Sequence, residues 1–233
     1  MDISIPNHLA IIPDGNRRWA KKHGKLPWLG HKAGFTRFHE VSEEAFLRGT
    51  NYVTIWGASV DNLKKRSRQE VSYLMLYMRQ ELAKKKLSDY CHKNQIRFRV
   101  IGQWHKVIKD YRLSVLIDRL EKQTRDFVKR RLTMLFGYDG VSEMLYAAKH
   151  LSVEEQRELD YETFKKKLWT KDLPQVDLVV RTGGEPHWSA GFMMWHSINS
   201  QLYFTETLWP DFDSRQLQKA YDDYGARERR FGR

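Results

Sequence analysis

The sequence predicts an α/β fold: a single domain with a mostly parallel central sheet flanked by helices. Short apolar runs, such as residues 8–12 and 178–181, have the length and composition of buried strands. Longer charged segments with apolar residues at helical spacing lie between these runs. Strands that alternate with helices favour parallel pairing, because each crossover helix carries the chain back over one face of the sheet. No Gly-, Ser- or Pro-rich linker interrupts residues 1–233, so we expect one domain over the whole chain.

In the first half of the chain, residues 8–12 (HLAII) form an unbroken apolar run and predict the first strand. The Asp-Gly-Asn that follows is turn chemistry, and the next residues, Arg-Arg-Trp-Ala-Lys-Lys, predict the start of a helix. Apolar residues at helical spacing predict a helix at 33–49, and residues 52–56 predict a second strand. Residues 68–93 predict one long amphipathic helix, with an apolar stripe formed by Val71, Leu74, Met75, Met78 and Leu82.

In the second half, residues 96–101 (IRFRVI) alternate in the period expected of a strand. Further strands are expected at residues 132–137, 178–181 and 201–204, and helices at residues 114–129, 142–150 and 161–170. A parallel sheet of this kind binds its ligand beyond the carboxyl ends of the strands. The residues directly after each strand are therefore the candidate site.

The charge balance indicates an anionic partner. The chain has 41 Lys and Arg against 29 Asp and Glu, a formal net charge of +12. This surplus suits phosphate groups, nucleic acid or an anionic membrane surface. The basic runs at residues 84–86 and 165–167 lie on predicted helices and fit solvated faces or a membrane surface better than nucleic acid, so we expect no nucleic-acid partner.

Cysteine content and hydropathy indicate the compartment. Cys91 is the only cysteine, which excludes an intramolecular disulfide and a cysteine-based zinc cluster. A reducing compartment is the natural expectation. The N-terminus lacks a basic segment followed by an apolar one, and no stretch is apolar enough to span a membrane. We therefore expect a cytoplasmic protein.

The segment after the first strand is suited to phosphate. Gly15 allows close approach of a ligand to the backbone, and a helix N-terminus presents free N–H groups. Arg17 and Arg18 add bidentate donors, and Asp14 is suited to a divalent ion that bridges it to a diphosphate. These residues leave an alternative open, in which Asp14 only caps the helix and the arginines are solvated.

Two further strand ends carry polar groups. Ser59, Asp61 and Asn62 follow the second strand and precede a basic triplet that ends at Arg66; an ordinary capped loop is the alternative. Arg181 ends a buried strand and enters a Gly-Gly turn, which directs a guanidinium toward the same edge of the sheet. The convergence of these strand ends favours a phosphate site. The motifs G-x-x-x-x-G-K-[ST], G-x-G-x-x-G, H-E-x-x-H and D-D-x-x-D are all absent.

Several spaced motifs resemble those of the cis-prenyltransferases, the undecaprenyl diphosphate synthase family. They are His8-x-Ala-Ile-Ile-x-Asp-Gly-Asn-x-Arg-Trp-Ala20, Gly30-His-x-x-Gly34, Ser59-x-Asp-Asn62, Asp177-Leu-Val-Val-Arg-Thr-Gly-Gly-Glu185, Leu202-Tyr-Phe204, Leu208-Trp-Pro-Asp-Phe212 and Arg227-Glu-Arg-Arg-Phe-Gly232. They cover nearly the whole chain in the family's order. The resemblance implies a homodimeric α/β enzyme that condenses isopentenyl diphosphate with an allylic diphosphate, such as farnesyl diphosphate, in cis units. It also implies Mg²⁺ as the cofactor, an apolar channel over the sheet, and an apolar product compatible with peripheral contact with a membrane.

The resemblance also implies roles for individual residues. Asp14 is expected to act with Mg²⁺ on the allylic diphosphate, and Asn62 occupies the family's proton-acceptor position. The residues expected to bind substrate are Gly15, Asn16, Arg17, Arg18, Trp19, His31, Ser59, Val60, Asp61, Leu63, Arg66, Arg181, His187 and Ser189. Of these, Arg181 and Ser189 are expected in the isopentenyl diphosphate site, and His187 stands for either the family's histidine or its neighbouring arginine. The terminal Arg230-Phe-Gly232 resembles a motif that reaches across the family's dimer.

Some positions depart from the family pattern. Pro27 replaces an arginine, Leu63 replaces an aromatic residue, and one extra residue lies between Glu185 and Phe192. Gln201 falls where a glutamate is expected to complete the magnesium site, and an amide is a weaker ligand for Mg²⁺ than a carboxylate.

These departures support an alternative, a weakly active or non-catalytic partner subunit of the same fold.

Leu135 and Phe136 replace small residues, and if they face the channel they should shorten the product. The apolar stripe of residues 68–93 is suited either to line that channel or to form ordinary core.

Overall fold

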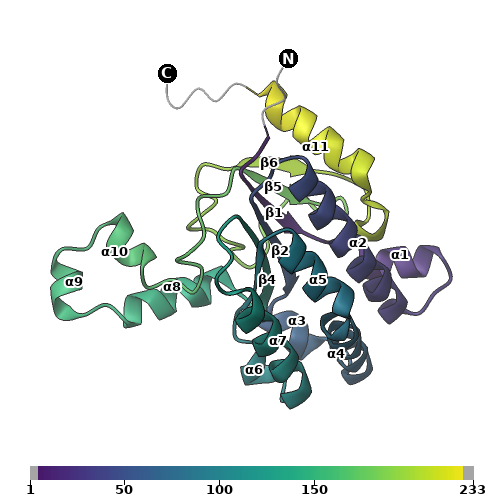
Figure 1. Ribbon diagram of the computed structural model, residues 1–233, viewed down its shortest axis with the longest axis horizontal. Coiled ribbons are helices and arrows are strands. Elements are labelled where there is room, and N and C mark those ends of the chain that lie inside the picture. The colour runs from purple at the N-terminus through teal and green to yellow at the C-terminus, as the bar shows by residue number, and fades with distance from the viewer. Residues whose placement is uncertain (1–4, 228–233) are drawn as a thin grey trace.

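The protein is built on one six-stranded sheet, and the computed structural model describes residues 5–227 (Figure 1). The strands are β1 (His8–Ile12), β2 (Tyr52–Ala58), β3 (Ile96–Ile101), β4 (Arg130–Phe136), β5 (Leu178–Arg181) and β6 (Gln201–Phe204). Every neighbouring pair is parallel, and the order is β3-β4-β2-β1-β5-β6. The predicted fold class is confirmed, and the sheet is parallel throughout.

The strand order determines where a ligand can bind. From β1 the chain first builds one half of the sheet through β2, β3 and β4, and it then crosses to the other side of β1 to form β5 and β6. The connections therefore leave the adjacent strands β1 and β5 in opposite directions, which opens a crevice at their carboxyl ends. Ile12 and Arg181 are paired at the ends of these two strands, so the segments that follow them meet at this crevice.

The strands alternate their side chains between two apolar cores. Leu9 and Ile11 belong to the larger core, whereas Ala10 and Ile12 belong to the smaller one on the opposite face. The larger core is covered by α2 (Pro27–Leu47), α4 (Arg68–Ala83), α5 (Lys85–Lys93), α7 (Tyr111–Thr124) and α11 (Ser214–Ala226). The smaller core is covered mainly by Trp169, Trp188, Phe192 and Met193 from segments between the elements.

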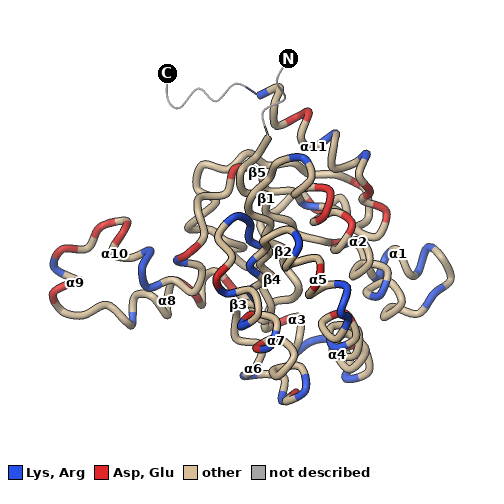
Figure 2. Tube along the Cα trace, viewed as in Figure 1, with Lys and Arg blue, Asp and Glu red and all other residues tan. Residues whose placement is uncertain are grey.

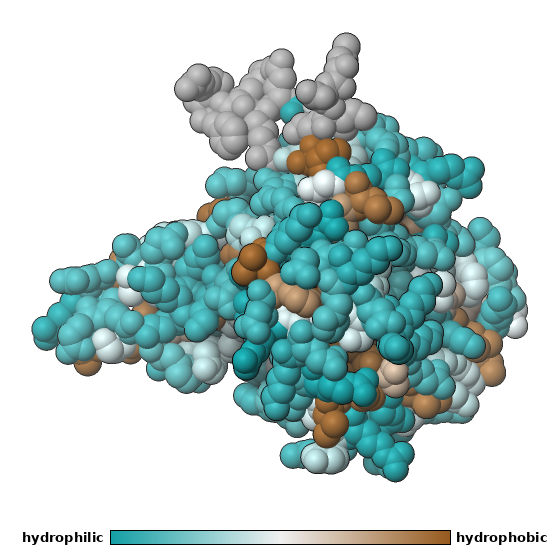
Figure 3. Space-filling view, viewed as in Figure 1, coloured by the Kyte–Doolittle hydropathy of each residue, from teal (hydrophilic) through white to brown (hydrophobic). Residues whose placement is uncertain are grey.

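The remaining helices are short or lie at the edges. They are α1 (Asn16–Lys22), α3 (Val60–Lys65), α6 (Trp104–Val107), α8 (Gly140–Lys149), α9 (Val153–Arg157), α10 (Tyr161–Lys165) and the 3-10 turn η1 (Trp209–Asp211). Helices α8, α9 and α10 extend away from the sheet as an arm (Figure 1). Acidic residues gather on α9 and α10, whereas Lys and Arg are distributed along much of the trace (Figure 2). The face seen in Figure 3 is mostly hydrophilic, with small separate hydrophobic patches.

The prediction of one helix over residues 68–93 is wrong. The helix stops at Lys84, whose φ of −68° and ψ of 124° are extended, and α5 starts at the next residue. A single straight helix of that length would run about 39 Å at 1.5 Å per residue, whereas the break allows α5 to pack against β3. The apolar positions Leu82 and Leu87 lie on both sides of the break, so the hydrophobic spacing did not reveal it.

Other boundaries differ as well. Helix α2 begins at Pro27, six residues before the predicted start, with the proline in the first turn where its missing N–H is not needed. The helix predicted at 161–170 ends at Lys165 and continues as turns. Within residues 5–227, no helix is both long enough and apolar enough to cross a bilayer.

Candidate active site

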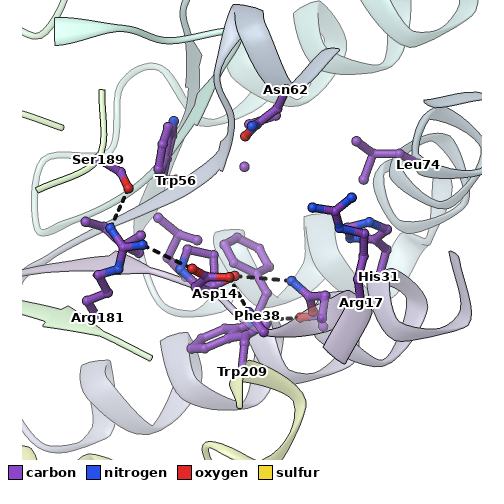
Figure 4. A pocket seen from close by; sticks show the side chains of 18 of the residues that line it. Asp14, Arg17, His31, Phe38, Trp56, Asn62, Leu74, Arg181, Ser189 and Trp209 are labelled. Atoms are coloured by element: carbon purple, nitrogen blue, oxygen red, sulfur yellow. Dashed lines mark hydrogen bonds and ion pairs between the residues drawn. The ribbon is translucent and has the colours of Figure 1, made fainter. Parts of the chain in front are cut away.

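A cavity of about 460 Å³ opens at the carboxyl ends of β1, β2 and β5. Its polar side is lined by the segment Pro13–Arg18 and by His31, Asn62, Arg66, Arg181, Glu185, His187 and Ser189. Its apolar side is lined by Phe35, Phe38, Ile55, Trp56, Leu74, Met134 and Trp209. Figure 4 shows Asp14 and Arg181 at one side of this space, with Asn62 and Leu74 across from them. One cavity thus combines charged groups with an apolar wall.

The turn between β1 and α1 forms the floor of the polar side. Gly15 has a φ of +108°, a conformation that residues other than glycine rarely adopt. A Cβ at this position would lie 2.8 Å from Leu208 Cδ2. Its N–H donates to Asp14 Oδ1 at 2.6 Å, and Trp209 N–H donates to the Asp14 carbonyl at 3.0 Å. The turn is therefore held from below by the 208–209 segment.

Two glycines of α2 allow α1 to lie close beside it. A Cβ on Gly30 would lie 2.0 Å from the carbonyl oxygen of Asn16, and a Cβ on Gly34 would lie 2.2 Å from Asn16 Oδ1. These close approaches give a physical reason for the Gly30-His-x-x-Gly34 pattern. They also bring His31, between the glycines, to the wall of the cavity.

Asp14 lies between two arginines. Arg18 Nη2 is 3.2 Å from Asp14 Oδ1, and Arg181 Nη2 is 3.1 Å from Asp14 Oδ2. Arg181 is 3 % exposed, and its Nη1 also donates to the His187 carbonyl at 2.7 Å and to Ser189 Oγ. The guanidinium is fixed by these bonds, which makes it a preorganised cation at the strand end.

A second cationic group lies across the cavity. Arg66 Nε is 3.4 Å from Glu70 Oε1, and its Nη1 is buried with no hydrogen-bond partner among the described residues. His31 Nε2 is 2.8 Å from the same Glu70 oxygen. This hydrogen bond lowers the pKa of Glu70, whereas burial lowers the pKa of His31. Glu70 thus anchors the two side chains that face the cavity.

Asn62 is held by a capping box at the start of α3. Its backbone N–H donates to Ser59 Oγ at 2.9 Å, and its side-chain oxygen accepts from the Ser59 N–H at 3.3 Å. The cap thus engages the side-chain oxygen, whereas the amide NH₂ has no hydrogen-bond partner among the described residues, and Asn62 lines the cavity. Ser59 itself is buried, and its hydroxyl serves the cap.

Most of the predicted substrate-binding residues meet in this cavity. Asp14, Gly15, Asn16, Arg17, Arg18, His31, Asn62, Arg66, Arg181, His187 and Ser189 all line it. The predicted residues outside its lining are Trp19, Ser59, Val60, Asp61, Leu63 and Gln201.

Trp19 and Asp61 contact residues outside the cavity lining. The Trp19 indole donates to Asp211 at 2.7 Å and carries Lys25 over its ring, so it braces α1 against η1. Asp61 is exposed and pairs with Lys65 at 2.7 Å. Leu63 is 4 % exposed and packs in the larger core, which places it behind the site.

Gln201 lies at the wrong end of its strand to share a metal ion with Asp14 of the same chain. It begins β6 and pairs with Leu178, whereas the site is at the level of Arg181, which pairs with Phe204. Three residues of strand separate the two levels by about 10 Å. Within one chain, the register of β6 therefore separates Gln201 from Asp14, and the metal role of Gln201 stays a prediction.

The period of β4 places Leu135 and Phe136 on opposite faces of the sheet. Leu135 packs in the smaller core, on the face of the sheet away from the helices, whereas Met134 and Phe136 point into the larger core. Of these three residues, Met134 lines the cavity. Phe136 packs beside Trp104, with ring centroids 6.1 Å apart.

The sequence reasoning singled out no role for several lining residues, among them Phe35, Phe38, Trp56, Glu185 and Trp209. Trp209 belongs to the Leu208–Phe212 motif, and its indole donates to the Gly34 carbonyl at 2.9 Å. Glu185 closes the polar rim through a 3.7 Å contact with Arg18. Phe35 and Phe38 carry no chemistry that a motif would reveal, because their role follows from the side of α2 on which they lie. The Arg230–Gly232 motif lies outside the described residues.

Comparisons with known proteins agree with this geometry. Residues 12–232 match the family model of undecaprenyl diphosphate synthase. An isoprenyl transferase from Fusobacterium nucleatum is 37 % identical over 232 residues, covering 100 % of this chain and 98 % of that protein. A tritrans,polycis-undecaprenyl-diphosphate synthase (GGDP specific) from Sulfolobus acidocaldarius is 34 % identical, covering 99 % of this chain and 89 % of that protein.

A solved structure shows the same architecture. The crystal structure of lavandulyl diphosphate synthase from Lavandula x intermedia, in complex with dimethylallyl diphosphate, superposes with a TM-score of 0.90 at 29 % identity. The match covers 98 % of this chain and 99 % of that one.

Proposed function

The chain is a prenyltransferase of the undecaprenyl diphosphate synthase family, and we propose that it joins isopentenyl diphosphate to an allylic diphosphate, such as farnesyl diphosphate, in cis units with Mg²⁺. The observation that carries this proposal is the two-sided cavity. Its polar side has Asp14 between Arg18 and Arg181, and its apolar side has Phe38, Leu74 and other hydrocarbon groups. A diphosphate with a prenyl chain has the same two halves.

The donor set fits a magnesium ion that is held mainly by substrate. Within residues 5–227, no cluster of three or more His, Cys, Asp or Glu is arranged to hold a metal. Mg²⁺ commonly binds through one or two carboxylates together with substrate phosphates and water. Asp14, whose side chain is 36 % exposed on the cavity wall, is the carboxylate that would hold it. When bound, the ion would offset negative charge on the departing diphosphate.

The proposed reaction joins two substrates and releases one diphosphate. The C–O bond at C1 of the allylic diphosphate breaks, and the diphosphate leaves with the bonding electrons. The terminal double bond of isopentenyl diphosphate supplies the electrons for the new bond to C1, and loss of a proton from its C2 forms the new double bond. Each cycle therefore lengthens the chain by one isoprene unit and returns an allylic diphosphate.

The cations of the site supply binding and charge stabilisation. Arg17 and Arg18, with the N–H groups at the start of α1, are placed for the allylic diphosphate. Arg181, His187 and Ser189 form a connected group that we assign to isopentenyl diphosphate. Because negative charge grows on the leaving group, fixed donors at this point stabilise the transition state more than the bound substrate.

Asn62 is assigned to the proton-transfer step. An amide is not a base at neutral pH, so its part is to hold the group that accepts the proton. Its oxygen is held by Ser59 and its NH₂ is free of partners among the described residues, which suits this group to orient a diphosphate oxygen or water as the acceptor. Asn62 would then contribute through position.

Assembly and location complete the proposal. Exposed apolar side chains occur on α8, on the 190–200 segment and on the edge strand β6: Val141, Leu145, Met194, Ile198 and Phe204. We assign these exposed side chains to the contact between two copies in a homodimer, whose formation sedimentation equilibrium tests directly. A cytoplasmic enzyme that contacts a membrane peripherally agrees with the single buried Cys91 and with an apolar product.

The test is prenyl transfer itself. The purified protein is incubated with radiolabelled isopentenyl diphosphate, farnesyl diphosphate and Mg²⁺, and the extracted lipids are sized. Asp14→Ala is run alongside, with Asp118→Ala on α7 as a matched control because Asp118 does not line the cavity. The proposal expects a metal-dependent product that Asp14→Ala lacks and Asp118→Ala retains. Absence of product across several allylic primers and Mg²⁺ concentrations would instead favour a non-catalytic partner subunit.

A further inference from the structure

Next to the apolar side of the active-site cavity, a narrow void of about 20 Å³ lies between α2 and α4. Phe35, Phe38 and Met134 line both spaces. The further wall of the void is formed by Met78, Leu82, Leu87 and Phe98. The two spaces share Phe35, Phe38 and Met134 as a common wall over the helix-covered face of the sheet, and we take them together as the path of a prenyl chain, called here the apolar tunnel.

The far end of this tunnel is closed by polar groups. His39 on α2 and Glu81 on α4 line the void, and their Nε2 and Oε2 atoms are 3.0 Å apart. Lys84 Nζ lies 2.6 Å from the other oxygen of Glu81. The hydrogen bond from His39, with a smaller contribution from Lys84, lowers the pKa of Glu81 to about 2, so this carboxylate is ionised at neutral pH.

Beyond the pair lies a second cavity, of about 240 Å³. His39, Glu81 and Leu87 line both this cavity and the narrow void. Its other walls come from α2 and α5, including Ser42, Lys86 and Tyr90. The His39–Glu81 pair therefore stands between an apolar tunnel and a space into which a longer chain could extend.

The position of Glu81 is unfavourable for the helix that carries it. Helix α4 ends at Ala83, so Glu81 lies in its last turn, where the partial negative charge of the helix end disfavours a carboxylate. The break at Lys84 also turns the chain at this point and opens the space between α2 and α5. His39 and Lys84 offset the unfavourable placement by their contacts with the carboxylate.

We propose that the hydrogen-bonded His39–Glu81 pair closes the prenyl tunnel and sets the greatest chain length that this protein accommodates. A hydrocarbon chain that passes this point must break the His39–Glu81 hydrogen bond or strip water from the Glu81 carboxylate without replacing the lost contacts, and both are costly. Chain growth is therefore favourable while each added unit enters the apolar tunnel and becomes unfavourable at the pair. This assignment rests on the proposed function for the origin of the chain, and it concerns His39 and Glu81 as determinants of length, not of chemistry.

The first readout is independent of catalysis. Dissociation constants are measured for n-alkyl phosphates of increasing chain length with the wild type, Glu81→Leu and His39→Leu. While the chain fills the tunnel, each added methylene should tighten binding by up to about fourfold. The wild type should reach a plateau at the length that meets the pair, and both variants should move this plateau to longer chains. Glu44→Leu is the matched control. Glu44 is on α2, as His39 is, its exposure is similar to that of His39 and Glu81, and it pairs with Arg48 at 2.7 Å outside these cavities.

The second readout is the length of the enzymatic product. Glu81→Leu and His39→Leu should give a longer maximum product than the wild type, whereas Glu44→Leu should not. An unchanged plateau together with an unchanged longest product would overturn the assignment. If the plateau shifts in the variants but even the wild type makes no product, the assignment of His39 and Glu81 to the tunnel end is upheld and the proposed function is rejected. The two variants replace opposite partners on different helices, so a folding defect in one leaves the other as the test.

Discussion

At the scale of single residues, Ser59 shows how a side chain outside the cavity can govern one inside it. Its hydroxyl accepts the Asn62 N–H, and its own N–H holds the Asn62 side-chain oxygen. We expect Ser59→Ala to cost about 1 kcal/mol of stability through loss of the cap. It should also lower kcat by about tenfold or more while leaving KM nearly unchanged, because a misplaced Asn62 acts on chemistry more than on binding.

A second capping box in the same protein provides the control for this prediction. Ser152 caps α9 and exchanges the same pair of bonds with Glu155, away from the cavity. Ser152→Ala should cost similar stability and leave prenyl transfer intact. Equal effects of the two variants on kcat, measured by initial rates, would show that the capping of α3 has no special bearing on Asn62.

His8 makes the stability of the fold depend on pH. It is fully buried, its Nδ1 donates to the Pro174 carbonyl and its Nε2 accepts from Thr54, so the neutral ring is satisfied. Burial lowers the pKa of His8 to about 4, against 6.5 for the unfolded chain. Between these two values the unfolded state binds the additional proton, so stability is full above pH 6.5 and falls as the pH decreases toward 4. The loss from this residue should approach about 3 kcal/mol.

Urea unfolding between pH 4 and 7 measures this effect, since the two ends of the window follow the two pKa values of His8. His8→Gln should flatten the dependence of stability on pH, and His105→Gln, at an exposed position on α6, should leave it steep. A wild-type dependence that survives His8→Gln unchanged would assign the protons to other groups, of which His196 is one, because burial lowers its pKa to about 3.

Single residues also show how far sequence reasoning reached. Asp14, Asn62 and Arg181 were identified because each follows or ends a strand, and parallel strands bring such residues to one edge. The locations of Gln201 and Leu135 could not be predicted, because they depend on strand register and on a period of two, which no motif encodes.

At the scale of elements, the turn that joins β1 to α1 is the most constrained part of the site. Gly15 has a φ of +108° and lies against Leu208, whereas Gly24 has a φ of +62° with nothing within 4 Å of its missing side chain. Gly15→Ala should therefore lose about 2 kcal/mol or more and reduce activity at least about a hundredfold, since the turn must shift. Thermal unfolding and initial rates measure the two effects.

Gly24→Ala isolates the cost of a positive φ alone. It should lose about 1 kcal/mol and retain activity, because the open space accepts the methyl group. If Gly15→Ala proved no more harmful than Gly24→Ala, the close packing of the turn on the 208–209 segment would be irrelevant to function.

The sequence predicts the type of each helix or strand better than the residues at which it begins and ends. The strands appeared where short apolar runs were found, because burial on both faces of a parallel sheet demands such runs. Helix ends were harder to predict. The apolar stripe continues from Leu82 to Leu87 across the break at Lys84, so periodicity alone favoured one helix. Short helices such as α3 and α9 depend on caps at Ser59 and Ser152, whose signals also fit loops.

At the scale of the whole molecule, the order of the strands explains the two-sided site. Reversal of the connections about β1 and β5 brings Asp14 and Arg181 together, and the helix layer over one face provides the apolar tunnel beside them. The polar end therefore lies at the strand ends and the apolar end within the larger core. This arrangement could be anticipated from alternation of strands and helices, whereas the depth of the tunnel follows from side-chain packing and could not.

The most direct test of the central claim is release of inorganic diphosphate, measured with Mg²⁺ and each substrate separately and then together. If the cavity joins an allylic diphosphate to isopentenyl diphosphate, release should require both substrates, match the isoprene units incorporated, and disappear in Asp14→Asn. Diphosphate release from an allylic substrate alone, with no added requirement for isopentenyl diphosphate, would contradict the account and indicate hydrolysis or coupling of allylic units in the same cavity.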